Sequence, residues 1–253
     1  MDDFEWLKKE IASGIYESGM LLTWYRNKPS GWKLASGAWS PFYINLRQIT
    51  SFPQLYSKVI DAFCMMLDRN GVSIAEHKAV GIAMGGIALA NGVSLRFGMP
   101  SLYTRKLPDG VSTREEISTY ISSHGQHALV EGVLKNNDRL ILFDDVVTSM
   151  ESKAMAINQI SMEVEKRGLS GVAVDSVYVV VDRGLGKEKA AALGLKLHSI
   201  LALEEIVNLL GDALAPNERK VMLDYLKDTK AFQDVEMQDE LRRAAKGGDT
   251  NQQ

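Results

Sequence analysis

Two carboxylates and several hydroxyl side chains follow one strongly apolar run of the chain. The run and the polar residues that succeed it are Leu140–Phe143, Asp144, Asp145, Thr148, Ser149 and Ser152. A helical segment begins at about Ser152, and a helix N-terminus offers free N–H groups and the positive end of the helix dipole to a phosphate. Acids this close to a phosphate need another partner, such as paired sugar hydroxyls or a magnesium ion held through water. The segment therefore predicts a site for a sugar phosphate.

Short apolar runs alternate with helical segments along most of the chain. We expect strands at Ala79–Ala83, Ser101–Thr104, Leu140–Phe143, Val177–Val181 and Lys196–Leu201, and helices at Phe4–Ser18, Pro53–Gly71, Gly86–Phe97, Ser152–Arg167 and Lys187–Leu193. This alternation predicts an α/β fold with a central, mostly parallel sheet flanked by helices. Ligands of such sheets bind beyond the carboxyl ends of the strands, which is where Asp144 lies.

Three stretches depart from this alternation. Ser40–Arg47 is expected to be extended, and Pro216–Ala245 is expected to form one or two helices appended to the sheet domain. Leu107–Gly132 is polar and long for a loop inside a compact domain, so it is either functional or disordered. Lys246–Gln253 is polar and is expected to be a frayed tail.

Composition narrows the class of protein. The chain has 253 residues, 45% of them hydrophobic, which is enough to bury a sizeable core without disulfides or a structural metal. A net charge of -3 gives no electrostatic case for nucleic-acid binding, and no apolar stretch is long enough to predict a membrane span. Cys64 is the single cysteine and lies in an apolar helical run, so we expect a packing role and a reducing, cytoplasmic location.

The acidic segment Asp144–Ser149, with the sequence DDVVTS, resembles the phosphoribosyl diphosphate (PRPP) signature of type I phosphoribosyltransferases. Further segments are similar to orotate phosphoribosyltransferase motifs and follow in the family's order: Lys33–Arg47, Val80–Ala90, Tyr103–Lys106, His124-Gly125, Val130–Gly132, Val181–Gly184 and Leu195–Ile200. The resemblance runs from about Lys33 to Leu210.

The resemblance implies a type I phosphoribosyltransferase fold with an N-terminal hood and a C-terminal helical extension. The implied segments are 1–50, 51–210 with a flexible loop at 107–132, and 211–253. It also implies a glycosyltransferase of the pentosyl class that uses PRPP and magnesium to convert orotate into orotidine 5′-monophosphate, in pyrimidine biosynthesis. A cytoplasmic homodimer without nucleic-acid or membrane partners is expected, because the family's loop usually serves the neighbouring subunit.

The same resemblance implies roles for individual residues. The catalytic candidates are Asp144, Asp145, His124, Arg105 and Lys106. The PRPP-binding candidates are Thr148, Ser149, Met150, Glu151, Ser152, Gly85 and Gly86. The candidates for contact with the base are Arg183, Thr148, Phe42 and Tyr43. Magnesium is expected to arrive with PRPP, through Asp144 or Asp145.

Four positions depart from the family pattern. Met150 and Glu151 stand where glycine is usual, Ser122 stands where a catalytic lysine is common, and Ala35 replaces a frequent lysine. Arg114 is the only basic residue between Lys106 and Ser123 that could substitute for that lysine. Two alternatives to orotate transfer therefore stay open: transfer to another base, and a catalytically weakened PRPP- or nucleotide-binding regulatory protein. Whether Trp39 is a surface residue or a dimer contact is likewise open.

Overall fold

The computed structural model describes residues 3–34, 37–108, 110–124, 128–148, 150–184 and 186–245. The chain divides into two compact units, one formed by residues 1–55 together with 201–253 and the other by residues 56–200. We predicted three consecutive segments with boundaries near residues 50 and 210. In the structure the N-terminal and C-terminal segments share one unit, and the sheet domain forms the other.

The unit of residues 56–200 is built on a six-stranded sheet with the order β10-β9-β8-β5-β6-β7. The strands are β5 (His77–Gly81), β6 (Ser101–Thr104), β7 (Val130–Glu131), β8 (Arg139–Val147), β9 (Ala173–Asp182) and β10 (Lys196–Ala202). Strand β5 pairs in parallel with β6 and β8, and β8 pairs in parallel with β9. Of these pairs and the pair of β6 with β7, only the last is antiparallel. The predicted α/β fold with a mostly parallel sheet is confirmed.

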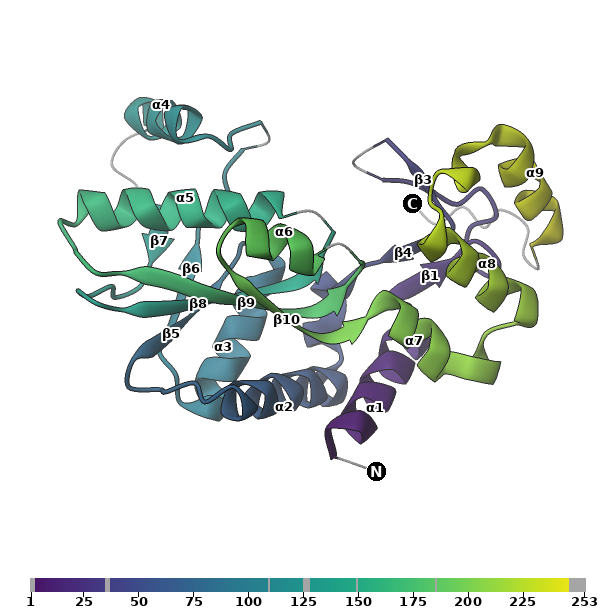
Figure 1. The fold of residues 1–253 in the computed structure, drawn as a ribbon, viewed down its shortest axis with the longest axis horizontal. Helices are drawn as coiled ribbons and strands as arrows, with labels where there is room; N and C mark the ends of the chain where they lie inside the picture. Colours follow the sequence, from purple (N-terminus) through teal and green to yellow (C-terminus); the bar gives the residue numbers. More distant parts are fainter. Residues whose placement is uncertain are drawn as a thin grey trace. The chain divides into compact units, whose positions relative to one another are not determined.

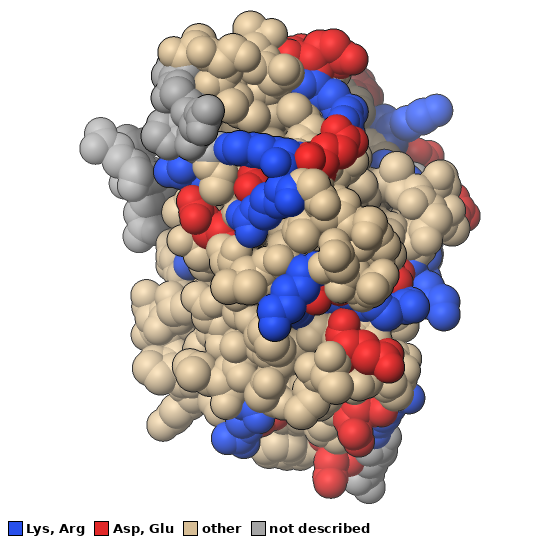
Figure 2. All heavy atoms as spheres, turned by 90° about the vertical axis from the view of Figure 1, so that its left-hand side faces the viewer, with Lys and Arg blue, Asp and Glu red and all other residues tan. Residues whose placement is uncertain are grey.

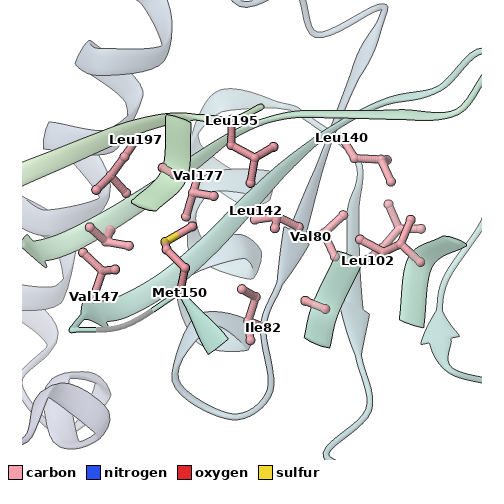
Figure 3. Close-up of a cluster of buried hydrophobic side chains, with 14 of the residues drawn as sticks. Val80, Ile82, Leu102, Leu140, Leu142, Val147, Met150, Val177, Leu195 and Leu197 are labelled. Atoms are coloured by element: carbon pink, nitrogen blue, oxygen red, sulfur yellow. The ribbon is translucent and has the colours of Figure 1, made fainter. Parts of the chain in front are cut away.

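Helices cover both faces of this sheet. Helices α2 (Pro53–Arg69) and α3 (Gly85–Phe97) lie on one face, and α5 (Glu151–Lys166) and α6 (Gly186–Ala192) lie on the other (Figure 1). Because both faces are covered, the central strands are apolar along nearly their whole length. Val80, Leu142 and Val177, on three neighbouring strands, belong to one buried cluster beneath α5 (Figure 3).

The segment expected to be a loop at 107–132 contains the helix α4 (Arg114–His124), which lies over the outer side of α5 (Figure 1). A capping box starts it: Glu116 accepts a hydrogen bond from the Thr113 amide at 2.9 Å, and the Thr113 hydroxyl accepts one from the Glu116 amide at 3.2 Å. Ile117 is buried with Leu107 and Leu129 in a small hydrophobic cluster. We did not predict this helix, although the spacing of Thr113 and Glu116 and the apolar residues one turn apart are sequence signals that could have indicated it.

The unit of residues 1–55 and 201–253 is mainly helical with two short two-stranded sheets. Its elements are α1 (Asp3–Glu17), β1 (Leu21–Thr23), β2 (Trp32–Lys33), β3 (Trp39–Ser40), β4 (Phe42–Ile44), a 3-10 helix (Leu46–Ser51), α7 (Leu203–Leu210), a 3-10 helix (Gly211–Ala213), α8 (Pro216–Lys227), a 3-10 helix (Ala231–Gln233) and α9 (Val235–Ala244). Strand β1 pairs with β4 and β2 pairs with β3, both antiparallel. The fully buried Glu218 of α8 accepts hydrogen bonds from the Thr23 hydroxyl and, at 3.0 Å, from the Arg26 guanidinium. The Arg26 side chain is 40% exposed, so this charge pair, buried only on the Glu218 side, joins the N-terminal and C-terminal segments within the unit.

The surface carries charges of both signs. On the face drawn in Figure 2, basic and acidic side chains lie next to one another among the described residues, without a continuous basic area. None of the helices in the described ranges combines the length and the apolar character needed to cross a membrane.

Candidate active site

The parallel strands of the sheet place their carboxyl ends at one edge. Strands β5, β6, β8 and β9 end there at Gly81, Thr104, Val147 and Asp182. Most of the predicted site residues directly follow or lie at these ends: Gly85, Gly86, Arg105, Lys106, Asp144, Asp145, Thr148, Met150, Glu151, Ser152 and Arg183. The fold thus brings residues from four separate segments of the sequence to one edge of the sheet, which is the edge at which open α/β sheets bind their ligands.

A pocket with a volume of about 330 Å³ opens at this edge. Three of its walls come from the segments singled out in the sequence, namely Ile82 and Ala83 after β5, Arg105 and Lys106 after β6, and Glu151 and Ser152 in the first turn of α5. Two cationic side chains and a helix N-terminus around one cavity favour an anionic ligand. Glu151 is exposed at the rim, where a first-turn acid is favourable for the helix dipole.

The turn from β8 into α5 exposes backbone N–H groups. The first helical hydrogen bond of α5 runs from the Ala154 amide to the Met150 carbonyl at 2.8 Å, so the amides of residues 151–153 have no acceptor inside the helix. Met150 has φ -91° and ψ 11°, which a non-glycine residue adopts without strain. Its side chain is buried in the sheet core, near Val147 (Figure 3). The methionine side chain therefore does not prevent the backbone amides of residues 151–153 from binding a phosphate. Ser149, which we also predicted to bind PRPP, lies outside the described residues.

Asp144 is engaged inside the protein on both of its carboxylate oxygens. Oδ1 accepts a hydrogen bond from the Asp145 amide at 2.9 Å, and Oδ2 accepts one from the Lys153 ammonium at 2.6 Å. Lys153 also donates to the Val146 carbonyl at 2.9 Å, and only 1% of the residue is exposed. Asp144 is 7% exposed. The two side chains thus form a buried ion pair underneath the turn.

Asp145 has a different environment, although it is the adjacent residue. Its Oδ1 accepts a hydrogen bond from the Val146 amide at 2.8 Å. Burial, and secondly the charge of Asp144, raise the pKa of Asp145 to about 6. A Cβ atom on Gly85 would lie 2.8 Å from this carboxylate, so the glycine leaves room for it. Of the two adjacent acids, Asp145 is therefore the one whose carboxylate has no ammonium group within hydrogen-bond distance among the described residues.

Gly86 has a packing role at the start of α3. A Cβ atom there would come within 1.9 Å of the Phe143 carbonyl oxygen of β8. The missing side chain lets α3 begin directly against the central strand, so any larger residue would displace the helix from the sheet edge. Its predicted role in binding PRPP stays a prediction.

Polar side chains of α5 hold the strand ends that carry the cations. Gln159 is 1% exposed and donates a hydrogen bond to the Arg105 carbonyl at 2.8 Å. The buried Glu163 accepts a hydrogen bond from the Leu129 amide at 2.6 Å, and the Arg105 amide donates to the Leu129 carbonyl at 3.0 Å. The segment that leaves the sheet at Arg105 and returns at Leu129 is therefore hydrogen-bonded to α5 at both of its ends.

The remaining predicted residues are Phe42 and Tyr43 in the other unit, Arg183 at the sheet edge and His124 at the end of α4. Phe42 and Tyr43 belong to the unit of residues 1–55 and 201–253, where the Phe42 side chain is fully buried and packs edge-on against Tyr225 with ring centroids 5.4 Å apart. Arg183 follows β9, and its amide donates to the Val147 carbonyl at 3.0 Å. His124 is the last residue of α4.

Lys153 is the residue of this site that we did not predict. It occupies the first position of a buried helical stripe that continues with Ala156, Ile160 and Glu163. A lysine at a position that the helical period assigns to the core, eight and nine residues after two acids, is the sequence signal for a buried ion pair.

The Lys153–Asp144 pair gives a direct stability prediction. In Lys153→Met the Asp144 carboxylate stays buried without its partner, so we expect a loss of about 3–5 kcal/mol in the free energy of unfolding. The double variant Lys153→Met/Asp144→Asn removes both charges and should recover most of that loss in urea unfolding. Equal stabilities of the single and double variants would contradict the pairing.

The raised pKa of Asp145 predicts a pH-dependent effect of Asp145→Asn on stability. A carboxyl whose pKa is raised on folding stabilises the folded chain while it is protonated, and this contribution is lost as the pH rises through about 6. An asparagine does not titrate, so this pH dependence of stability is absent from the variant. The melting temperature of Asp145→Asn minus that of wild type should therefore increase between about pH 4 and pH 8. Calorimetry across this range checks it, with Asp212→Asn, at an exposed position, as control. A constant difference between Asp145→Asn and wild type would refute the assignment.

Known proteins resemble this chain in sequence and in fold. The chain is 32% identical over 195 residues to the orotate phosphoribosyltransferase of Staphylothermus marinus, covering 76% of this chain and 84% of that protein. The crystal structure of the Aeropyrum pernix orotate phosphoribosyltransferase superposes with a TM-score of 0.57 at 27% identity, covering 79% of this chain and 99% of that one. Leishmania donovani UMP synthase shares the fold with a TM-score of 0.68 at 22% identity; 87% of this chain matches 42% of that longer chain.

No family model matches the chain. The level of identity to the Staphylothermus protein, and the extent of both chains that it covers, are nevertheless sufficient to assign the family. This chain belongs to the orotate phosphoribosyltransferase family.

Proposed function

We propose that this chain transfers the phosphoribosyl group of PRPP to orotate, giving orotidine 5′-monophosphate and diphosphate. The observation that carries the proposal is the pocket at the sheet edge, where Arg105 and Lys106 face a cavity that is also lined by the first turn of α5. Cations suit the diphosphate, and the free amides at the helix N-terminus suit the 5-phosphate. Family membership supports the same reaction.

Each group has a distinct task in this reaction. The bond from the anomeric carbon to diphosphate breaks, while a new bond forms from that carbon to a nitrogen of orotate. Arg105 and Lys106 neutralise the departing diphosphate, whose negative charge grows as the bond breaks. Asp145 accepts hydrogen bonds from the ribose hydroxyls and thereby holds the sugar in line for attack. Arg183 is our candidate for binding the orotate carboxylate, because a guanidinium can hold a carboxylate through two hydrogen bonds.

Magnesium is part of the proposal as an ion that enters with PRPP. Among the described residues there is no group of three or more histidine, cysteine or acidic side chains that would hold a metal alone. Magnesium commonly binds through one or two carboxylates together with substrate phosphates and water, and Asp145 supplies a carboxylate for this arrangement. When bound, the ion would neutralise charge on the diphosphate.

The assembly and location are also proposals. We propose a cytoplasmic homodimer that has small molecules as its ligands and no nucleic-acid partner. The family resemblance motivates the dimer, and the single cysteine motivates the reducing compartment. Light scattering of the purified protein would measure the oligomeric state, and a monomer at micromolar concentration would contradict it.

The reaction is tested by incubating the full chain with PRPP, magnesium and orotate and following orotate absorbance. We expect turnover, a preference for orotate over other pyrimidines and purines, and a KM for orotate that rises at least about tenfold in Arg183→Ala with little change in KM for PRPP. Turnover of another base alone would redirect the proposal to that base. Thermal stabilisation by PRPP without turnover of any base would favour the regulatory alternative.

A second prediction concerns the missing loop lysine. Arg114 does not serve as its substitute in this structure, because its guanidinium donates to Ser161 at 2.9 Å and to Glu165 at 2.6 Å. Glu165 lies about 20 Å along α5 from Glu151 in the first turn of the helix, at 1.5 Å per residue. Because the exposed Ser122 stands where the family commonly has lysine, Ser122→Lys should raise kcat.

We expect an increase of at least about tenfold, since one added charge stabilises the departing diphosphate. Ser118→Lys places the same charge one helical turn earlier on α4 and serves as the control. Equal rates in wild type and both variants would show that this position does not act in the reaction.

A further inference from the structure

Helix α5 holds both backbone groups of Arg105, the first of the two pocket cations. The buried Gln159 side chain donates a hydrogen bond to the Arg105 carbonyl at 2.8 Å. The Arg105 amide donates to the Leu129 carbonyl at 3.0 Å, and the Leu129 amide in turn donates to the buried Glu163 carboxylate at 2.6 Å. One helix therefore fixes the peptide groups on both sides of the Arg105 side chain, directly through Gln159 and indirectly through Leu129.

Gln159 begins a stripe of polar side chains along α5. Glu163 and the C-cap residue Arg167 follow at intervals of four residues, which places all three on one face of the helix. The Arg167 guanidinium donates to Glu163 at 2.7 Å, to the Val130 carbonyl at 2.7 Å and to the Gly132 carbonyl at 2.9 Å. The Glu163 carboxylate is thus paired, and the strand that the stripe holds cannot shift along the helix without breaking these bonds.

The sheet itself supports Arg105 only weakly. Strand β7 is two residues long and forms the outer edge of the sheet, so it has few ladder hydrogen bonds. Arg105 follows directly after the last residue of β6. The Glu131 carboxylate lies 3.7 Å from the Arg105 guanidinium, and both side chains are partly exposed, so this ion pair contributes little. The direction of the Arg105 side chain therefore depends on the backbone bonds to Leu129 and Gln159.

The same helix carries the amides that we propose for the 5-phosphate. Gln159 lies about 10 Å along the helix axis from Ser152 in the first turn, at 1.5 Å per residue. Ser152, Gln159 and Arg105 all line the pocket at the sheet edge. PRPP carries its single phosphate and its diphosphate on opposite ends of one ribose, so the two anion sites must keep a fixed separation. A helix that holds both sites meets this requirement.

We propose that Gln159 is a positioning residue for the diphosphate, which directs the Arg105 guanidinium into the pocket through the Arg105 carbonyl. The inference rests on the proposed function, in which Arg105 neutralises the departing diphosphate. The Gln159 amide group is bonded to the Arg105 carbonyl, so Gln159 acts on the ligand through the cation. The buried face of α5, in addition to its N-terminus, then sets the affinity for PRPP.

The test measures the binding of inorganic diphosphate, with magnesium present, to the full chain by calorimetry, in a double-mutant cycle of Gln159→Met and Arg105→Ala. Gln159→Met keeps the side-chain length and removes the donor to the Arg105 carbonyl. We expect it to weaken diphosphate binding about fivefold to twentyfold, since one buried hydrogen bond is lost. In the Arg105→Ala background the same change should alter the affinity by less than about twofold, because the group that Gln159 positions is absent.

Asn158→Leu is the matched control. Asn158 precedes Gln159 on α5, and its amide also donates to a backbone carbonyl of the segment between Arg105 and Leu129, that of Ser112, at 3.3 Å. This variant should bind diphosphate with the wild-type affinity. Steady-state kinetics give a second readout: Gln159→Met should raise KM for PRPP and change KM for orotate by less than about twofold. A loss of folded protein would lower the number of binding sites and leave the dissociation constant unchanged.

An unchanged diphosphate affinity in Gln159→Met, or an equal effect of this change with and without the Arg105 side chain, would overturn the inference. A loss of affinity in Asn158→Leu as large as that in Gln159→Met would overturn it too, and so would a wild-type protein that binds no diphosphate. Absence of orotate turnover in a wild type that binds diphosphate would refute only the proposed reaction, and the cycle would still decide whether Gln159 acts through Arg105.

Discussion

A buried ion pair between Lys153 and Asp144 fixes the point at which the central strand β8 turns into α5. The ammonium bonds both to the Asp144 carboxylate and to the Val146 carbonyl, so it holds the helix start against the strand end. Two consequences follow from this contact. The first-turn amides of α5 are presented at the sheet edge, and Asp145, the neighbouring acid, is left to meet a ligand. Moving the Lys153 and Asp144 charges out of water costs free energy, and this cost is offset only because both side chains are hydrogen-bonded inside the protein.

The proposed PRPP residues lie in one compact unit. Residues 56–200 supply the proposed phosphate amides, the cations and the ribose acid on one sheet edge, and α5 fixes that edge through Lys153 and Gln159. Within the other unit, residues of the C-terminal extension bond to the N-terminal segment: Gln233 and Tyr225 hydrogen-bond to the backbone of Trp39. The two-residue strands of that segment have few ladder hydrogen bonds of their own, so these contacts help to fix it.

The sequence predicted the unit of residues 56–200 well, because its strands are continuous apolar runs. Its helices show a clear helical spacing of apolar residues and residues typical of helix ends. Ser101–Thr104 was located to the residue, and the segment around Asp144 identified the sheet edge. Other features were not predictable in the same way. The partner of Lys153 depends on a side-chain direction, the burial of Phe42 depends on Tyr225 from the other end of the chain, and α4 was hidden by the polar composition of its segment. Met150 looked unfavourable only on the assumption of a positive φ, which the turn does not have.

The central claim is that the β8–α5 turn holds the ribose 5-phosphate with Asp145, and not Asp144, as the acid that meets the sugar. The most direct measurement is a crystal structure of the chain with PRPP and magnesium. The account predicts the 5-phosphate on the amides of residues 151–153, the ribose hydroxyls on Asp145, and the Lys153–Asp144 pair intact. A structure in which Asp144 leaves Lys153 to bind the sugar, or in which the phosphate lies away from α5, would contradict it.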